Sequence, residues 1–176
     1  MNLPVQVTSE YTKKNLLEMQ KVLHRRTARL CLILAGCGML LALIGITLFG
    51  VIEGGGLMVY IGLFWCLLFL GMRYHPARKN AKNTVKSNEK NYGCNVSTTL
   101  KFYNSMLTAH NETTGSDLKE SYDEVRELLR RDDVIVLVLP DRVALMADSS
   151  TLPEEDAKEL WDLLREKCRN AEVFEQ

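Results

Sequence analysis

The stretch from Leu30 to Met72 constrains the fold more than any other part of this sequence, because Glu53 is its only charged residue. Glu53 divides it into an uncharged run of 23 residues, Leu30–Ile52, and another of 19 residues, Gly54–Met72. As α-helices these runs would be about 35 Å and about 28 Å long, and the hydrocarbon core of a bilayer is about 30 Å thick. Each run is therefore long enough to cross a membrane as one helix.

The segment between the two runs predicts a reversal of the chain. A carboxylate at the bilayer centre is disfavoured by about 3 kcal/mol, so we expect Glu53 at a membrane–water interface. The triplet Gly54-Gly55-Gly56 follows, and glycine accepts the positive φ angles of tight turns. We predict a transmembrane helical hairpin with spans at 30–52 and 57–74 and an external turn at 53–56. A phosphate-binding loop is disfavoured because no Lys follows the glycines.

Small residues recur within the two runs, and small side chains let helix backbones approach closely in a membrane. The residues concerned are Gly36, Gly38, Ala42, Gly45 and Gly62. We expect them to pack the two spans together, and self-association of the chain through them stays open.

The tetrapeptide Leu34-Ala35-Gly36-Cys37 resembles the cleavage box of bacterial lipoproteins. A signal peptide has a short basic start and an apolar core of about 7–15 residues before its cleavage site. Here 29 residues precede the apolar run, and only Leu30–Ile33 lie between the last Arg and the box. The apolar run then continues beyond Cys37 to Ile52. We therefore expect Cys37 to lie inside a membrane helix.

The 22 basic and 22 acidic residues balance overall but are distributed in blocks. Basic residues near the ends of a span favour the cytoplasmic side of the membrane. The residues expected to set the topology are Arg25, Arg26 and Arg29 before the first span, Arg73, Arg78, Lys79 and Lys82 after the second, and the acidic Glu53 in the turn. Both termini are therefore predicted to be cytoplasmic, in a multi-pass protein of the cell membrane.

The basic connector at 75–93 has a second interpretation, because each Lys or Arg beside an anionic leaflet adds about 1 kcal/mol of attraction. It could bind lipid head groups, or it could only set topology and solvate a linker, which we favour. Nucleic acid is not an expected partner, since residues 91–176 carry eighteen acidic and ten basic residues.

Residues 1–29 are predicted to form a cytoplasmic strand and helix. Val5 and Val7 alternate with Gln6, as in a strand, and Thr8-Ser9-Glu10 has the pattern of a helix start. The helix is expected to continue into the first span.

Residues 94–176 are predicted to form a small cytoplasmic α+β domain. Alternating or apolar runs predict strands at 96–103, 106–111, 118–122, 134–139 and 143–147, whereas 125–131 could be a strand or a helical turn. Thr151 to Glu154 fits a capping box for a final amphipathic helix, whose apolar stripe is Ala157, Leu160, Trp161, Leu164 and Cys168. We expect a small antiparallel sheet closed by that helix, a layout close to the pleckstrin-homology type.

This order of parts resembles the YcxB-like family of bacterial membrane proteins over nearly the whole chain. The resemblance depends on the start VQVTSEYTKKNLLEMQKVLHRR, the hairpin and the basic connector, followed by Phe102, Ser121-Tyr122 with Val125, and the apolar strand 134–139 followed by Ala144. Where the family often has Ile-Pro and a basic residue, this chain has Leu145-Met146-Ala147-Asp148. The resemblance implies a membrane-anchored cytoplasmic domain and supplies no functional residues.

The sequence carries no recognisable catalytic, cofactor or metal motif. Its five Cys form no Cys-x-x-Cys pair, and His24, His75 and His110 are scattered. Cys94 and His110 could be imagined as nucleophile and base, but no orienting group accompanies them.

We therefore expect a membrane-anchored interaction or regulatory module that binds a protein partner, with no enzymatic activity. Two alternatives remain open at this point. The first is an enzyme acting on a lipid or small molecule at the membrane interface, and the second is an accessory subunit of a larger membrane complex.

Overall fold

The computed structural model describes residues 4–48 and 55–175 and has an α+β fold. The chain divides into two compact units, one formed by residues up to 22 together with those from 81 onward, and the other by residues 23–80. This division differs from the predicted one, in which residues 1–29 and 94–176 were separate regions. The reason is that the first strand pairs with strands that follow the hairpin in sequence.

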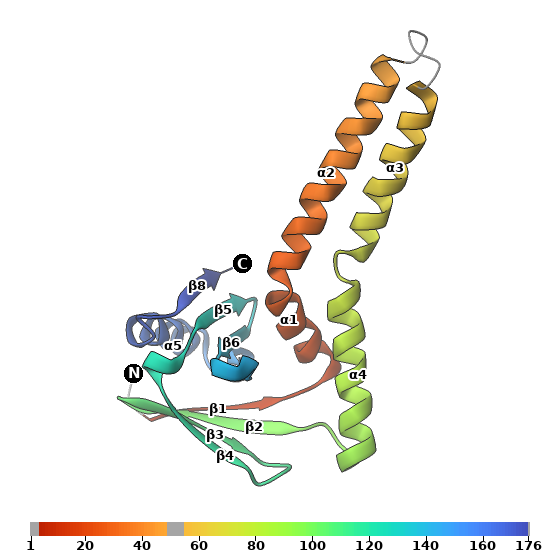
Figure 1. The fold of residues 1–176 in the computed structure, drawn as a ribbon. Helices are drawn as coiled ribbons and strands as arrows, with labels where there is room; N and C mark the ends of the chain where they lie inside the picture. The colour runs from red at the N-terminus through yellow and green to blue at the C-terminus, as the bar shows by residue number, and fades with distance from the viewer. Residues whose placement is uncertain (1–3, 49–54, 176) are drawn as a thin grey trace. The chain divides into compact units, whose positions relative to one another are not determined.

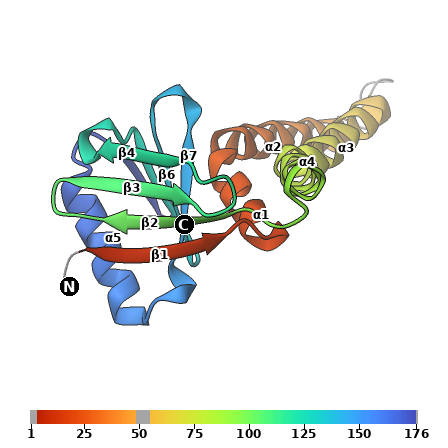
Figure 2. The same ribbon diagram turned by 90° about the horizontal axis from the view of Figure 1, so that it is seen from below.

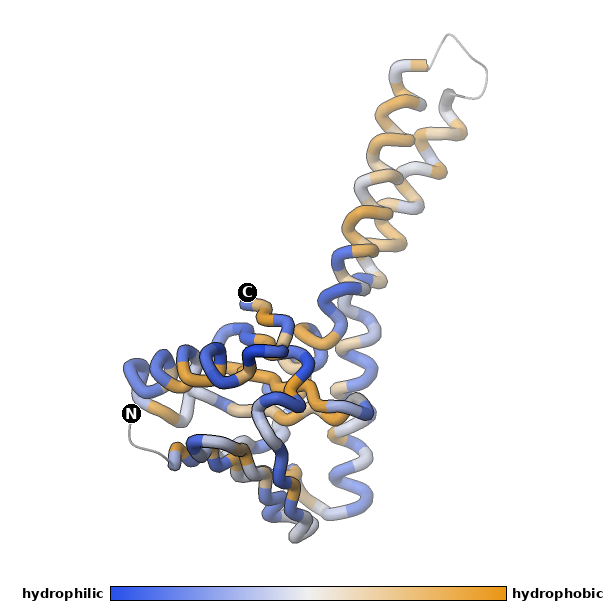
Figure 3. The backbone as a smooth tube through the Cα atoms, turned by 60° about the vertical axis from the view of Figure 1, so that its left-hand side comes forward, coloured by the Kyte–Doolittle hydropathy of each residue, from blue (hydrophilic) through white to orange (hydrophobic). Residues whose placement is uncertain are grey.

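The helical unit contains α2 (Arg25–Thr47), α3 (Gly55–Met72) and the start of α4 (His75–Tyr92) (Figure 1). By length and composition, α2 and α3 are apolar enough to cross a membrane. α2 begins five residues earlier than the predicted span, and Gly55 and Gly56 are helical rather than part of a turn. Glu53 and the rest of the predicted turn before Gly55 lie outside the described residues. Apolar residues follow one another along α2 and α3, whereas α4 is mainly hydrophilic (Figure 3).

The contact between α2 and α3 is made by small residues. The buried face of α2 includes Ala28, Ala35, Gly38, Ala42 and Gly45, and Gly62 of α3 lies against it. A Cβ at Gly62 would lie 2.5 Å from both the Gly38 oxygen and the Ala42 nitrogen, so the backbones touch there. The predicted packing role is confirmed for Gly38, Ala42 and Gly62, and Gly45 is buried on α2. Gly36 instead has open space on its side of the helix.

The other unit contains two sheets and is called the sheet unit below. Its first sheet is antiparallel, with the order β1-β2-β3-β4. Its strands are β1 (Val5–Glu10), β2 (Ser97–Phe102), β3 (Met106–Asn111) and β4 (Asp117–Ser121) (Figure 2). The prediction of a helix start at Thr8 is wrong, because β1 continues to Glu10 in register with β2. The helix α1 (Lys13–Leu23) begins later, where Thr12 Oγ1 accepts a hydrogen bond from the Asn15 amide at 3.2 Å. It ends before His24 and does not continue into α2.

The second sheet has the order β7-β6-β5-β8. Its strands are β5 (Glu127–Arg131), β6 (Val134–Val138), β7 (Ala144–Asp148) and β8 (Glu172–Glu175). The ambiguous segment at 125–131 is therefore a strand. The single antiparallel sheet expected from the sequence is corrected to two sheets, and β8, which pairs with β5 in parallel, was not predicted.

The core lies between the two sheets and α5 (Glu154–Lys167). Phe102 of the first sheet, Ile135 of the second sheet and Leu164 of α5 all belong to this core, and each side chain is fully buried. The predicted stripe on α5 is confirmed, because all five of its residues are buried. The predicted capping box is wrong: Thr151 ends a short 3₁₀ turn and its hydroxyl donates to the Asp148 carbonyl at 2.8 Å, while Pro153 precedes α5.

Candidate functional site

Most of the basic residues expected to set topology lie in the helical unit, near the start of α2, the end of α3 and the start of α4, and Lys82 belongs to the other unit. Arg25 and Arg26 begin α2, and Arg73 follows the end of α3. The His24 Nε2 and Asn80 Nδ2 atoms are 3.1 Å apart, which places the start of α2 beside the start of α4. Arg26, Arg29, Arg78, Lys79 and Lys82 are exposed, whereas Arg25 is buried and Arg73 lies over the Tyr74 ring at 4.8 Å. Of the predicted set, only Glu53 lies outside the described residues.

The sides of α2 and α3 that face away from each other present large apolar residues. Leu30, Ile33, Leu40, Phe64 and Leu67 are among them, and each is at least 60% exposed. Soluble monomers rarely expose a continuous apolar surface of this kind, because its hydration is unfavourable. The surface is suited to a bilayer or to another apolar partner.

The predicted basic connector is a regular helix, α4, and not an irregular linker. Pro76 stands at its second residue, where the missing N–H costs no helical hydrogen bond. Arg78, Lys82, Lys86 and Lys90 recur every four residues and are all exposed. Like charges at this spacing repel, by about 0.2–0.5 kcal/mol per pair, so the stripe favours a location near anionic groups.

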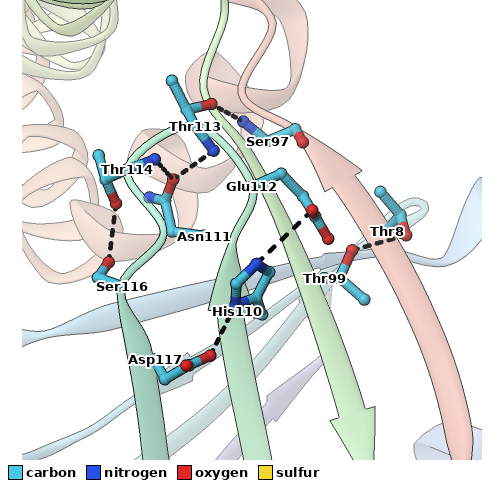
Figure 4. Close-up of polar contacts among 10 residues, drawn as sticks. All are labelled: Thr8, Ser97, Thr99, His110, Asn111, Glu112, Thr113, Thr114, Ser116 and Asp117. Carbon is cyan, nitrogen blue, oxygen red and sulfur yellow. Dashed lines mark hydrogen bonds and ion pairs between the residues drawn. The ribbon is translucent and has the colours of Figure 1, made fainter.

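The outer face of the first sheet carries a row of polar residues from all four strands, Thr8, Thr99, His110 and Asp117 (Figure 4). The hydroxyls of Thr8 and Thr99 are 3.0 Å apart. His110 Nδ1 lies 2.7 Å from Asp117 Oδ1, and His110 Nε2 lies 3.7 Å from Glu112 Oε2. The hydrogen bond to Asp117 and the nearby negative charges raise the pKa of His110 above its ordinary value.

His110 therefore has the orienting carboxylate that sequence reasoning missed, since Asp117 reaches it only through the pairing of β3 with β4. An oriented His needs an adjacent nucleophile to act in covalent catalysis. Within residues 4–48 and 55–175, no Cys, Ser or Thr side chain hydrogen-bonds to His110, and Cys94 is exposed without contacting it. The structure does not bring the imagined Cys94–His110 pair together.

The turn beside this row is organised by Asn111. Its Oδ1 accepts hydrogen bonds from the amides of Thr113 and Thr114, at 3.0 and 2.9 Å (Figure 4). Gly115 then takes a φ of +68°, which glycine tolerates without strain. These contacts explain the shape of the turn, so none of them indicates a ligand site.

A pocket beside α1 is lined by Lys14, Asn15, Glu18, Asp132, Asp133, Val134, Asp148 and Ser150. Two polar groups of the pocket bind one another, because Asn15 Nδ2 donates to Asp148 Oδ2 at 2.7 Å. Glu18 Oε2 lies 3.2 Å from Nε of Arg131, which is not part of the lining. These bonds join α1 to the second sheet. Across the described part of the chain, no group of three or more His, Cys, Asp or Glu side chains could hold a metal ion.

No protein-family model and no curated protein matches this sequence. The resemblance to the YcxB-like family, with its pleckstrin-homology-like layout, therefore stays a prediction.

Proposed function

We propose that this protein is a membrane-anchored interaction module, with α2 and α3 crossing the cell membrane and the two-sheet unit in the cytoplasm. The observation that carries the proposal is the pairing of β1 with β2. These neighbouring strands lie on either side of the whole hairpin in the sequence, and their register runs from Val5↔Phe102 to Glu10↔Ser97. Two hydrogen-bonded strands must lie on the same side of a membrane, which supports an even number of crossings between them.

The same pairing argues against a lipoprotein. Cleavage before Cys37 would remove β1, whose Val5 and Val7 belong to the core of the sheet unit. The basic residues at one end of the helical unit support a cytoplasmic position for the chain on both flanks. The exposed apolar sides of α2 and α3 support burial in lipid.

A topology experiment tests the membrane part of this proposal. A chain that keeps only Cys94, with the other four Cys replaced by Ala, would be treated with a membrane-impermeant maleimide. Cys94 is exposed, so we expect labelling only after the cells are permeabilised. The matched control is a Glu53→Cys chain lacking native Cys, which should label in intact cells. Labelling of Cys94 in intact cells would reverse the proposed orientation.

The interaction part is tested by cross-linking in cells, mild detergent extraction and mass spectrometry of proteins that co-purify with the full chain. An unrelated two-span protein with the same tag is the control. We expect a protein partner that is absent from the control. A chain that remains monomeric and without a partner after cross-linking would contradict the module. The enzyme alternative has no specific observation in its favour among the described residues.

A further inference from the structure

The helical unit keeps one register from the middle of its helix pair to the start of α4. His24 Nε2 and Asn80 Nδ2 are 3.1 Å apart, and a Cβ added to Gly38 would lie 2.9 Å from the Cys66 nitrogen. Gly38 follows His24 by fourteen residues, and Cys66 precedes Asn80 by fourteen residues. Because an α-helix rises by about 1.5 Å per residue, this equal spacing holds the two antiparallel segments level with each other.

The register brings the ends of the two apolar runs to the same level. On α2 the uncharged run begins at Leu30, directly after Arg29, and on α3 it ends at Met72, directly before Arg73. Leu30 and Met72 are 60% and 51% exposed, so apolar surface reaches this boundary on both helices. A change from apolar to cationic surface at one level matches the boundary between the hydrocarbon core and the head-group region of a bilayer.

Two further cations stand near the start of α4. Arg78 and Lys79 are exposed there, as Arg29 is on α2. Within residues 23–80 the only acidic residue is Glu53, and at least twenty positions separate it from Arg29 and Arg73. In the described part of the chain, none of these four cations forms an ion pair with an Asp or Glu. The helical unit therefore concentrates positive charge at this boundary without a counter-charge of its own.

Arg73 also has an unused hydrogen-bond donor. Its Cζ lies 4.8 Å from the centroid of the Tyr74 ring, a contact that uses the face of the guanidinium and none of its N–H groups. Its Nε has no hydrogen-bond acceptor among the described residues. A guanidinium can bind phosphate through two parallel N–H···O bonds. A phosphate oxygen from outside the chain would supply the acceptor that this side chain lacks.

The position of these cations beside an apolar surface narrows the kind of ligand. A free phosphate or an acidic peptide would contact the cations but leave Leu30 and Met72 exposed to water. An anionic phospholipid carries a phosphate and acyl chains on one molecule. It can therefore bind the cations and cover the neighbouring apolar side chains together.

We propose that Arg29, Arg73, Arg78 and Lys79 form a binding site for the phosphate group of an anionic phospholipid in the cytoplasmic leaflet. The proposal rests on the membrane crossing of α2 and α3 proposed above and names the ligand class at this end of the hairpin. The acyl chains would lie along the exposed apolar sides of the two helices. A role in topology alone would need the positive charges but no preference for an anionic lipid.

Native mass spectrometry of the full chain measures this preference. The chain would be kept in a neutral detergent with equal amounts of phosphatidylglycerol and phosphatidylcholine that have identical acyl chains. We expect the unaltered chain to retain phosphatidylglycerol about tenfold more often, because phosphatidylcholine has no net charge. Glycerol 3-phosphate at the same concentration should leave the bound lipid in place. Its displacement of the lipid would indicate a soluble phosphate ligand and would overturn the proposal.

A matched pair of variants separates the site from the overall charge of the chain. The site variant replaces all four cations of the proposed site with Gln. The control replaces four exposed basic residues of the sheet unit with Gln: Lys119, Lys158, Arg165 and Arg169. We expect the preference for phosphatidylglycerol to fall to about twofold or less in the site variant and to stay near tenfold in the control. No preference in the unaltered chain, or the same loss in both variants, would overturn the proposal.

A third variant keeps the charge, because the site variant also loses cations that help to orient the chain. It carries Arg29→Lys, Arg73→Lys and Arg78→Lys. Since Lys lacks the fork of N–H groups, we expect an approximately threefold loss of preference, about as far as one lost donor pair would weaken it. A full preference in this variant would show that net charge alone attracts the lipid and would overturn the site.

The labelling of Cys94 separates failure of this site from failure of the membrane crossing. If Cys94 is labelled only after the cells are permeabilised and no lipid preference is measured, only the lipid site is wrong and the anchored module stands. Labelling of Cys94 in intact cells would instead contradict the proposed orientation, whichever lipid the chain retains.

Discussion

The hydroxyl groups of Thr8 and Thr99 lie 3.0 Å apart, although 91 positions separate the two residues along the chain. The contact joins β1 to β2 across the insertion of α1, α2, α3 and α4. The sheet unit is thus one structure with a long insertion between adjacent strands, and residues on both flanks of the hairpin depend on each other for stability.

Removal of a core side chain from β1 should destabilise the whole sheet unit. Val7 is 1% exposed and faces Leu100, so Val7→Ala should lower the free energy of unfolding by about 2 kcal/mol. Gln6→Ala, on the exposed side of the same strand, should change it by less than about 0.5 kcal/mol. Urea unfolding followed by circular dichroism compares the two. An effect of Val7→Ala as small as that of Gln6→Ala would mean that β1 contributes nothing to the core.

Addition of a methyl group at Gly62 should weaken the contact of α2 with α3. Its Cβ would lie 2.5 Å from backbone atoms of Gly38 and Ala42, which are too rigid to yield without separating the helices. We expect Gly62→Ala to destabilise the helical unit by about 1–3 kcal/mol. Gly36→Ala is the control, because its Cβ meets nothing within 4 Å. Thermal denaturation in detergent should show a lower midpoint for Gly62→Ala alone.

The titration of His110 should report its partner Asp117. Because the hydrogen bond to Asp117 raises the pKa of His110, its imidazolium is favoured in the folded state. The resulting stabilisation is fully present below the unfolded-state pKa of about 6.5 and is lost as pH rises through the higher folded-state value. NMR titration should give a midpoint above 6.5 that falls in Asp117→Asn. A midpoint insensitive to this substitution would contradict the contact. Both side chains are substantially exposed, so the effect on stability should be small.

The thiols of the sheet unit should differ sharply in reactivity. Burial raises the pKa of Cys168 to about 12, and the side chain is 1% exposed. Since the thiolate is the reactive form, Cys168 should resist a thiol reagent at pH 8 until the unit unfolds. Cys94 is exposed and should react in the native state. Mass spectrometry of single-Cys chains, with and without urea, measures both rates. Rapid native labelling of Cys168 would show that α5 opens readily.

Local patterns in the sequence were sufficient for several elements. The uncharged runs predicted α2 and α3, the apolar segment at 134–139 predicted β6 with both faces covered, and the stripe from Ala157 to Cys168 predicted the buried face of α5. These features arise from periodicity and length, which neighbouring residues carry by themselves. These local patterns do not establish the resemblance to a known family or the proposed protein partner.

The tertiary structure alone decided how the strands are shared between sheets. Alternation marks Val5 and Val7 as a strand but does not name Phe102 and Leu100 as its partners, because pairing depends on segments brought together by folding. Asp117 reaches His110 for the same reason. β8 has four residues and little buried surface, so its strand conformation comes from hydrogen bonding to β5 rather than from its own pattern. The sequence thus determined which segments are apolar and regular, and long-range pairing determined which of them share a sheet.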